Sequence, residues 1–161
     1  MGELNPWWVG GGAVAVVALV LGARWVWHLG WAVQVERARE LFRLQHERFE
    51  EQFLAAAAAT GRPRGLTWAG CTITGDAVVV RDTATGGIVA LVPVVIQFEP
   101  VAGSDMEDVP AARDPRPATA VFAFARGGKW ETAGRVVFNH TPEQTVAKFA
   151  PQFRLIRHGH H

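Results

Sequence analysis

Apolar residues run without a polar side chain from Trp7 to Ala23. In a helix that rises about 1.5 Å per residue, this run covers about 25 Å. Extending it to Trp27 gives about 31 Å, close to the ~30 Å hydrocarbon core of a bilayer. Arg24 then falls near one interface, where its long side chain can reach the headgroups. The pattern therefore predicts a transmembrane anchor within residues 1–31.

Tryptophans flank the run at both ends, as an aromatic belt at each interface predicts. They are Trp7 and Trp8 at one end and Trp25, Trp27 and Trp31 at the other. A cleaved signal peptide is one alternative, but the segment before the run contains Glu3 and no Lys or Arg. A buried core helix is the other, and each residue of Gly10–Gly12 would weaken a helix in water by about 1 kcal/mol relative to Ala. A membrane span is favoured over both.

Small residues recur along the predicted span at spacings of three and four. They are Gly11, Ala15, Ala18 and Gly22. Such a face lets two helix backbones approach closely in a bilayer. It predicts association with a second copy or with another membrane protein, unless it reflects only how frequent Gly and Ala are in this chain.

Basic residues set the predicted orientation, because the positive flank of a span stays in the cytoplasm. No Lys or Arg precedes the span. The other flank carries Arg24, Arg37, Arg39 and Arg43. We therefore expect residues 32–161 on the cytoplasmic side.

A juxtamembrane helix is predicted over residues 32–61, since Val33–Ala59 contains no Gly or Pro. Gly61 and Pro63 end it. Apolar positions with helical spacing form a stripe suited to packing on a sheet. They are Val35, Ala38, Phe42, Phe49, Phe53 and Ala56.

From Leu66 onward, short runs rich in Val, Thr, Ile and Phe predict strands. The first covers residues 66–82, with a break at Gly75. The second covers residues 87–100, where Pro93 predicts a bulge or an edge position, because proline has no N–H to donate.

The clearest hairpin covers residues 118–139, turning at Gly127–Gly128. Thr141 and Gln144 form a capping box with Pro142 in the first turn, so a short helix is predicted over 142–150. Residues 151–161 are read as a basic tail.

These elements predict an α+β fold, in which a long helix packs on a four-stranded antiparallel meander followed by a short C-terminal helix. The domain covers residues 62–150. Its element order over 35–140 resembles the cystatin-like and NTF2-like folds.

The segments "GGIVALVPVVIQFEPVAGSDMEDVP" and "ATAVFAFARGGKWETAGRVVFN" resemble a family of small, uncharacterised bacterial single-pass membrane proteins. The pattern is an acidic Met-Glu loop between a long strand and a Gly-Gly-x-Trp hairpin. The resemblance implies the bacterial inner membrane as location. It brings no activity and no functional residues.

The sequence contains no nucleophile elbow, phosphate loop or dinucleotide fingerprint, so no catalytic, cofactor-binding or metal-binding residues are predicted. The net charge is +1, and no run of basic residues interleaves with aromatics, which disfavours nucleic-acid binding. Cys71 is the only cysteine, so an intrachain disulfide is impossible. We expect it to act as a small buried hydrophobe rather than as a reactive thiol.

Two sets of candidate residues remain. Asp105, Glu107 and Asp108 lie in a long loop that could face a partner, or could simply be solvated. Trp68, Trp130 and His140 could line a pocket, although core positions for the tryptophans and a local cap for the histidine are the simpler interpretations.

Two functional hypotheses follow, beside a purely structural role in which the domain is only a spacer or scaffold. The first is a single-pass membrane-anchored accessory or interaction protein whose α+β domain is not catalytic. The alternative is a membrane-tethered domain that binds a small ligand, or an enzyme, with an NTF2-like pocket.

Overall fold

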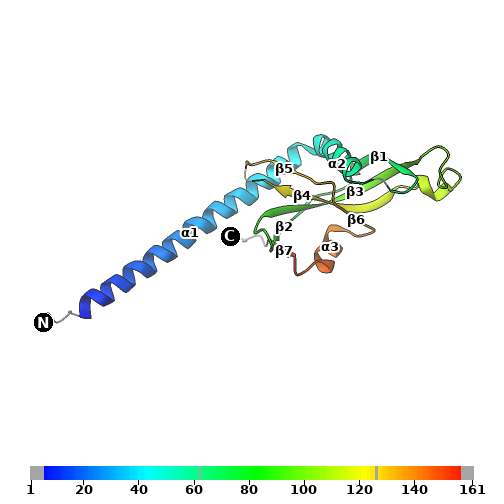
Figure 1. Ribbon diagram of the computed structural model, residues 1–161. Coiled ribbons are helices and arrows are strands. Elements are labelled where there is room, and N and C mark those ends of the chain that lie inside the picture. The colour runs from blue at the N-terminus through cyan, green and yellow to red at the C-terminus, as the bar shows by residue number, and fades with distance from the viewer. Residues whose placement is uncertain (1–5, 62, 126, 157–161) are drawn as a thin grey trace. The chain divides into compact units, whose positions relative to one another are not determined.

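A computed structural model describes residues 6–61, 63–125 and 127–156 of the 161-residue chain. The chain divides into two compact units, residues 1–37 and residues 38–161 (Figure 1). The fold is α+β, with a long apolar helix near the N-terminus and an antiparallel sheet in the second unit, as the sequence predicted.

The first unit contains most of helix α1 (Pro6–Leu44). Every side chain from Val14 to Trp27 is exposed, and Leu19 is 74% exposed. Within the described residues the chain has one helix that is long and apolar enough to cross a membrane. The surroundings of the Trp7 and Trp8 side chains lie outside the described residues.

The predicted small-residue face is helical. Ala15, Ala18 and Gly22 are exposed, and a Cβ added at Gly22 would meet no atom within 4 Å. Gly11 lies in the part of α1 whose side-chain surroundings are not described.

The second unit begins with the last turns of α1, followed by helix α2 (His46–Thr60). The single helix expected over 32–61 is instead interrupted at Gln45, whose φ of −126° and ψ of 28° are not helical. The rings of Phe42 and Phe49 stack across the break with centroids 4.7 Å apart. The break lets both helical segments place buried aromatic side chains on the same sheet.

The sheet has seven strands, whereas four were predicted. The strands are β1 (Leu66–Ile73), β2 (Val78–Asp82), β3 (Ile88–Pro100), β4 (Arg116–Phe124), β5 (Trp130–Glu131), β6 (Val136–Phe138) and β7 (Phe153–Leu155). Two of the expected strands are each split into two, and β7 forms from residues that were read as a tail. β7 pairs with β2 and extends the sheet by one strand.

The first split explains how Pro93 is accommodated within the sheet. β1 and β2 pair with the same side of β3, and β4 pairs with the other side, so β3 is not an edge strand. Pro93 lies opposite the gap between β1 and β2, where the Thr74 N–H donates to its carbonyl oxygen at 3.0 Å. The missing N–H of proline therefore faces the gap, and no ladder bond is lost.

The second split occurs between β5 and β6 and includes Gly134, which has a φ of +74°. Gly134 is buried, and a Cβ placed there would lie 2.5 Å from the backbone nitrogen of Ala57 in α2. The backbone at Gly134 therefore runs directly against the backbone of α2, a contact that a residue with a Cβ would block.

Helices cover both faces of the sheet (Figure 1). On one face, Phe122 of β4 contacts the rings of Phe42, Phe49 and Phe53. On the other face lies a buried cluster of Val80, Val89, Leu91 and Phe153, with Val146 and Phe149 packed against it.

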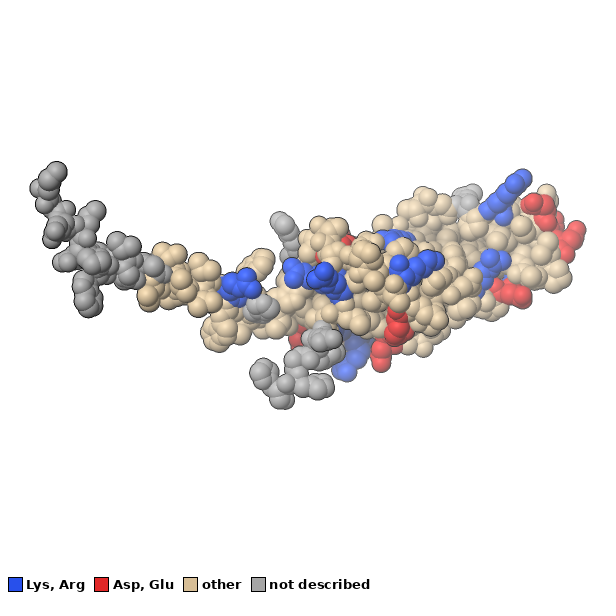
Figure 2. Space-filling model, turned by 90° about the horizontal axis from the view of Figure 1, so that it is seen from below, with Lys and Arg blue, Asp and Glu red and all other residues tan. Residues whose placement is uncertain are grey.

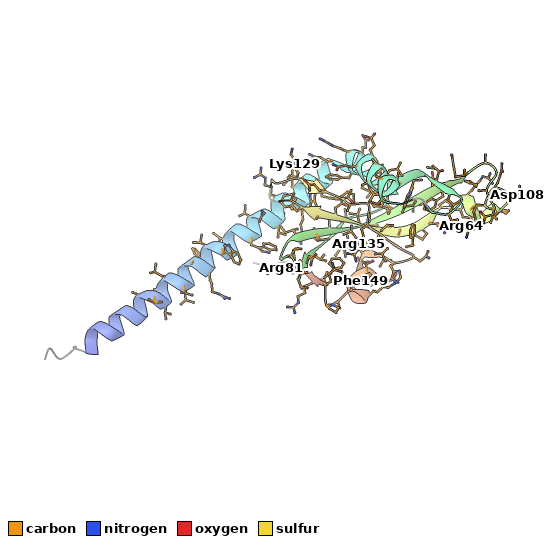
Figure 3. The ribbon with its side chains drawn as sticks, in the orientation of Figure 1. Arg64, Arg81, Asp108, Lys129, Arg135 and Phe149 are labelled. Carbon is orange, nitrogen blue, oxygen red and sulfur yellow. The ribbon has the colours of Figure 1, made fainter. Side chains whose placement is uncertain are left out.

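Helix α3 (Pro142–Lys148) has the predicted capping box, in which the Thr141 side chain accepts from the Gln144 N–H. It is not the last element, because β7 follows it. The Arg135 guanidinium lies 5.4 Å from the centroid of the Phe149 ring, and so helps to cover the cluster beneath α3 (Figure 3). A short 3₁₀ helix, η1 (Pro110–Arg113), precedes β4.

Candidate functional site

Trp130 of β5 contacts the last turns of α1 through a hydrogen bond and an aromatic contact. Its side chain is 4% exposed, and its Nε1–H donates to the carbonyl oxygen of Ala38 at 2.8 Å. Its ring lies edge-on to Phe42 at 5.5 Å and contacts Phe124 at 5.0 Å. The indole therefore fills space between the helix and the sheet, with its one polar atom satisfied.

Trp68 and His140 both contact Phe138, whereas Trp130 contacts Phe42 and Phe124. Trp68 is half-buried, stacks with Phe138 at 6.4 Å and donates its Nε1–H to the Gly61 carbonyl oxygen at 2.9 Å. The Nδ1 of His140 lies 2.8 Å from the Phe138 carbonyl oxygen, and its Nε2 lies 3.4 Å from the Nζ of Lys148. Because a carbonyl can only accept, Nδ1 carries the proton and Nε2 accepts from the lysine.

The acidic loop is exposed and is held in place by its own hydrogen bonds. Asp105, Glu107 and Asp108 are all exposed. Figure 3 shows Asp108 at one end of the sheet, and Figure 2 shows acidic side chains on the surface at that end. A carboxylate oxygen of Glu107 accepts from the Gly103 N–H at 2.6 Å. The Ser104 hydroxyl donates to the Gly65 carbonyl oxygen at 3.2 Å, which ties the loop to the turn before β1. The loop therefore presents its acidic residues in a defined arrangement.

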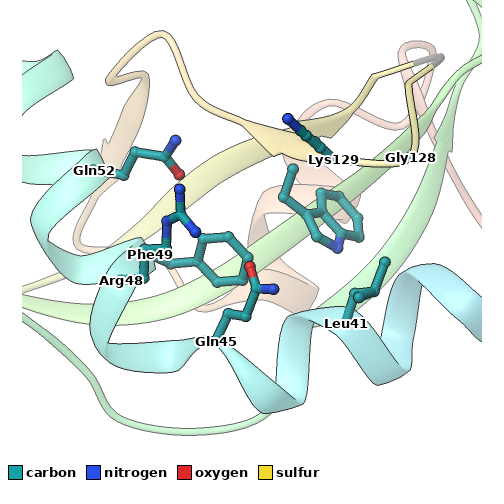
Figure 4. Close-up of a pocket in the computed structure, with 8 residues that line it drawn as sticks. Leu41, Gln45, Arg48, Phe49, Gln52, Gly128 and Lys129 are labelled. Atoms are coloured by element: carbon teal, nitrogen blue, oxygen red, sulfur yellow. The ribbon is translucent and has the colours of Figure 1, made fainter.

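A hollow of about 160 Å³ lies between the helices and the β4–β5 turn (Figure 4). Its lining consists of Leu41, Gln45, Arg48, Phe49, Gln52, Gly128, Lys129 and Trp130. No sequence pattern predicts this hollow, since its residues come from two distant segments and the hollow depends on the helix break at Gln45. The turn signal at Gly127–Gly128 was the one sequence feature that pointed to this place.

A second depression, of about 470 Å³, is shallower and more open. It is lined by Ala69, Gln97, Phe98, Glu99, Pro100 and Arg113. Its two charged residues are of opposite sign, so it has no net charge.

Cys71 is a free, half-buried thiol on β1. Desolvation by burial, and then the charge of Glu50, raise the pKa of Cys71 to about 12. The thiol therefore stays protonated at neutral pH, which makes it a poor nucleophile. Glu50 itself accepts a hydrogen bond from the Ile73 N–H at 2.7 Å and so fastens α2 to β1.

Within the described residues, no group of three His, Cys, Asp or Glu side chains is placed to hold a metal ion. No family model, curated protein or solved structure matches this chain. The proposals below rest on the chain's own geometry.

Proposed function

We propose that this protein is a single-pass membrane-anchored accessory protein, whose second unit is a non-catalytic interaction domain. The observation that carries the proposal is the exposed apolar surface of α1 from Val14 to Trp27. Each large apolar side chain left in water forgoes about 1.5–3 kcal/mol of burial free energy. A contiguous surface of this kind needs lipid or another protein to cover it.

The second unit supports a binding role over catalysis, because two of its candidate pocket residues are engaged structurally and its thiol is held protonated. The Trp130 indole N–H and both ring nitrogens of His140 have hydrogen-bond partners. The Cys71 thiol has a pKa raised to about 12. A nucleophile or general base needs the opposite, a group whose pKa lies near the working pH.

Two surfaces are proposed to meet partners. Within the bilayer, Ala15, Ala18 and Gly22 would let α1 pack closely against a second copy or another membrane protein. Outside it, the acidic loop would face a partner protein. The proposed location is the bacterial inner membrane, with the second unit in the cytoplasm, on the basis of the flanking arginines.

The alternative is a small-ligand-binding domain or an enzyme with a pocket at Trp68, Trp130 and His140. It has less support. Trp130 packs against Phe42 and Phe124, while Trp68 and His140 both lie at Phe138. On the side of Trp130 away from the hollow that it lines, aromatic rings fill the helix–sheet interior.

Membrane insertion is tested by alkaline carbonate extraction of membranes carrying the full chain. We expect the protein to remain in the membrane pellet. The variant Leu19→Arg/Val20→Arg places two arginines near the centre of the span. Each arginine makes the free energy of membrane insertion less favourable by about 2.5–3.5 kcal/mol, so this variant should appear in the supernatant. A matched control, Val101→Arg/Val109→Arg, changes two exposed valines of the second unit and should stay in the pellet. Wild-type protein in the supernatant would contradict the proposal.

A further inference from the structure

The hollow beside the β4–β5 turn carries positive charge that the proposed function does not use. Arg48 and Lys129 line it, together with the amides of Gln45 and Gln52, and no Asp or Glu belongs to its lining. Among the described residues, neither cationic side chain has an ion pair or hydrogen bond. The hollow therefore has two positive charges that no lining carboxylate offsets.

Two buried aromatic side chains, Phe49 and Trp130, form the base of the hollow. Phe49 is 2% exposed and stacks with Phe42, and Trp130 is held by its hydrogen bond to Ala38. From the helical side, Gln45, Arg48 and Gln52 line the hollow, and Lys129 comes from the turn that precedes β5 (Figure 4). The two cations therefore come from α2 and from the turn before β5.

The second depression provides a contrast within the same unit. There Arg113 shares the lining with Glu99, so an anion would meet a carboxylate as well as a guanidinium. The hollow at Arg48 has two cations and two glutamine amides in its lining, and no carboxylate. Its volume of about 160 Å³ lies below the ~300–1,000 Å³ of pockets that enclose drug-sized ligands, so it suits one charged group rather than a whole molecule.

We propose that this hollow binds a phosphate group. Arg48 offers a planar fork that can donate two hydrogen bonds to phosphate oxygens, and Lys129 adds a compact positive charge. The Gln45 and Gln52 amides can donate to the remaining oxygens. A free phosphate compound and the phosphodiester of an anionic lipid headgroup share this chemistry. The proposal stands independently of membrane anchoring, because inorganic phosphate alone is a sufficient probe.

The test uses the full chain in maltoside micelles, which contain no phosphate. The reporter is the NMR signal of the Trp130 indole N–H, identified by its loss in Trp130→Phe. Inorganic phosphate and a short-chain phosphatidylglycerol are titrated in separate arms. A saturable shift with phosphate supports a site that accepts free phosphate. A shift with the lipid alone supports the headgroup as the source.

Matched double variants separate this site from general charge. Arg48→Gln/Lys129→Gln should weaken phosphate binding by about tenfold or more, because losing one hydrogen bond between charged groups lowers the binding constant by about that factor or more. Arg64→Gln/Arg113→Gln removes the same charge from exposed residues that do not line the hollow and should leave the binding midpoint unchanged. Arg48→Lys keeps the charge but loses the fork, so an intermediate weakening is expected.

Two results would overturn the proposal. One is the absence of a shift with either probe in wild-type protein. The other is an equal loss of binding in both double variants, which would mean that the net charge of the unit, and not the hollow, attracts the anion. Far-UV circular dichroism of each variant verifies that the exposed substitutions leave the fold intact.

Discussion

The contact of Gly134 with α2 gives a sharp prediction for the substitution Gly134→Ala. Two costs add. A side chain at a φ of +74° costs about 1–2 kcal/mol. The new Cβ would also lie 2.5 Å from the Ala57 nitrogen, and overpacking of this kind costs about 1–3 kcal/mol. The free energy of unfolding should therefore fall by about 2–5 kcal/mol.

Gly128→Ala isolates the first cost. Gly128 has the same φ of +74°, and an added Cβ there meets no atom within 4 Å. This variant should lose only about 1–2 kcal/mol. At about 4 °C per kcal/mol for a domain of this size, Gly134→Ala should lower the Tm by about 8–20 °C and Gly128→Ala by about 4–8 °C. Thermal melts followed by near-ultraviolet circular dichroism measure both. Equal Tm shifts for the two variants would refute the reasoning, because the contact with α2 would then cost nothing.

Three further predictions concern the side chains of Trp130, Cys71 and Thr141. Trp130→Phe removes the hydrogen bond to Ala38 and should lower the urea-unfolding free energy by about 1–3 kcal/mol, whereas an unchanged value would mean that water replaces the indole. Because the pKa of Cys71 is raised to about 12, its maleimide labelling at pH 8 should be about a thousandfold slower than in guanidinium-unfolded protein and should rise as the pH approaches 12. Glu50→Gln should speed the labelling of the folded protein, since it removes the charge that helps to raise this pKa; equal rates would exclude that coupling. Thr141→Ala removes the capping box and should cost about 1 kcal/mol, seen as faster amide hydrogen exchange across α3 than in wild type; unchanged exchange would show that the cap contributes nothing.

Local signals in the sequence predicted most of the elements. The long apolar run predicted a helix, and the capping box placed the start of α3 at Pro142. The glycine pair Gly127–Gly128 marked the turn between β4 and β5, and the break at Gly75 lies between β1 and β2. Each of these features depends on residues close together in the chain, where propensity and capping act directly.

Features that depend on tertiary contacts were missed. Nothing at Gln45 is a helix breaker, so the interruption there reflects packing of Phe42 and Phe49 on the sheet rather than local preference. β7 is three residues long and is stabilised by pairing with β2, which no pattern in so short a segment reveals. The hollow at Arg48 and Lys129 was missed because it joins residues from separate elements around the break at Gln45.

The candidate residues illustrate the same limit. The sequence named Trp68, Trp130 and His140 as residues that could share a pocket. In the structure, the hydrogen bonds of their ring nitrogens go to Gly61, Ala38 and Phe138 respectively. Residue type alone cannot tell an indole that stacks on a ligand from one that closes a core, because both uses need the same ring and the same N–H donor.

The central claim is a single membrane span with the second unit in the cytoplasm. The most direct measurement fuses a reporter that is active on only one side of the membrane, after Ile156 in one protein and before Glu3 in another. We expect cytoplasmic activity for the fusion after Ile156 and an external location for the fusion before Glu3. External activity after Ile156 would reverse the orientation argued from the flanking arginines. A soluble fusion would contradict the membrane span itself.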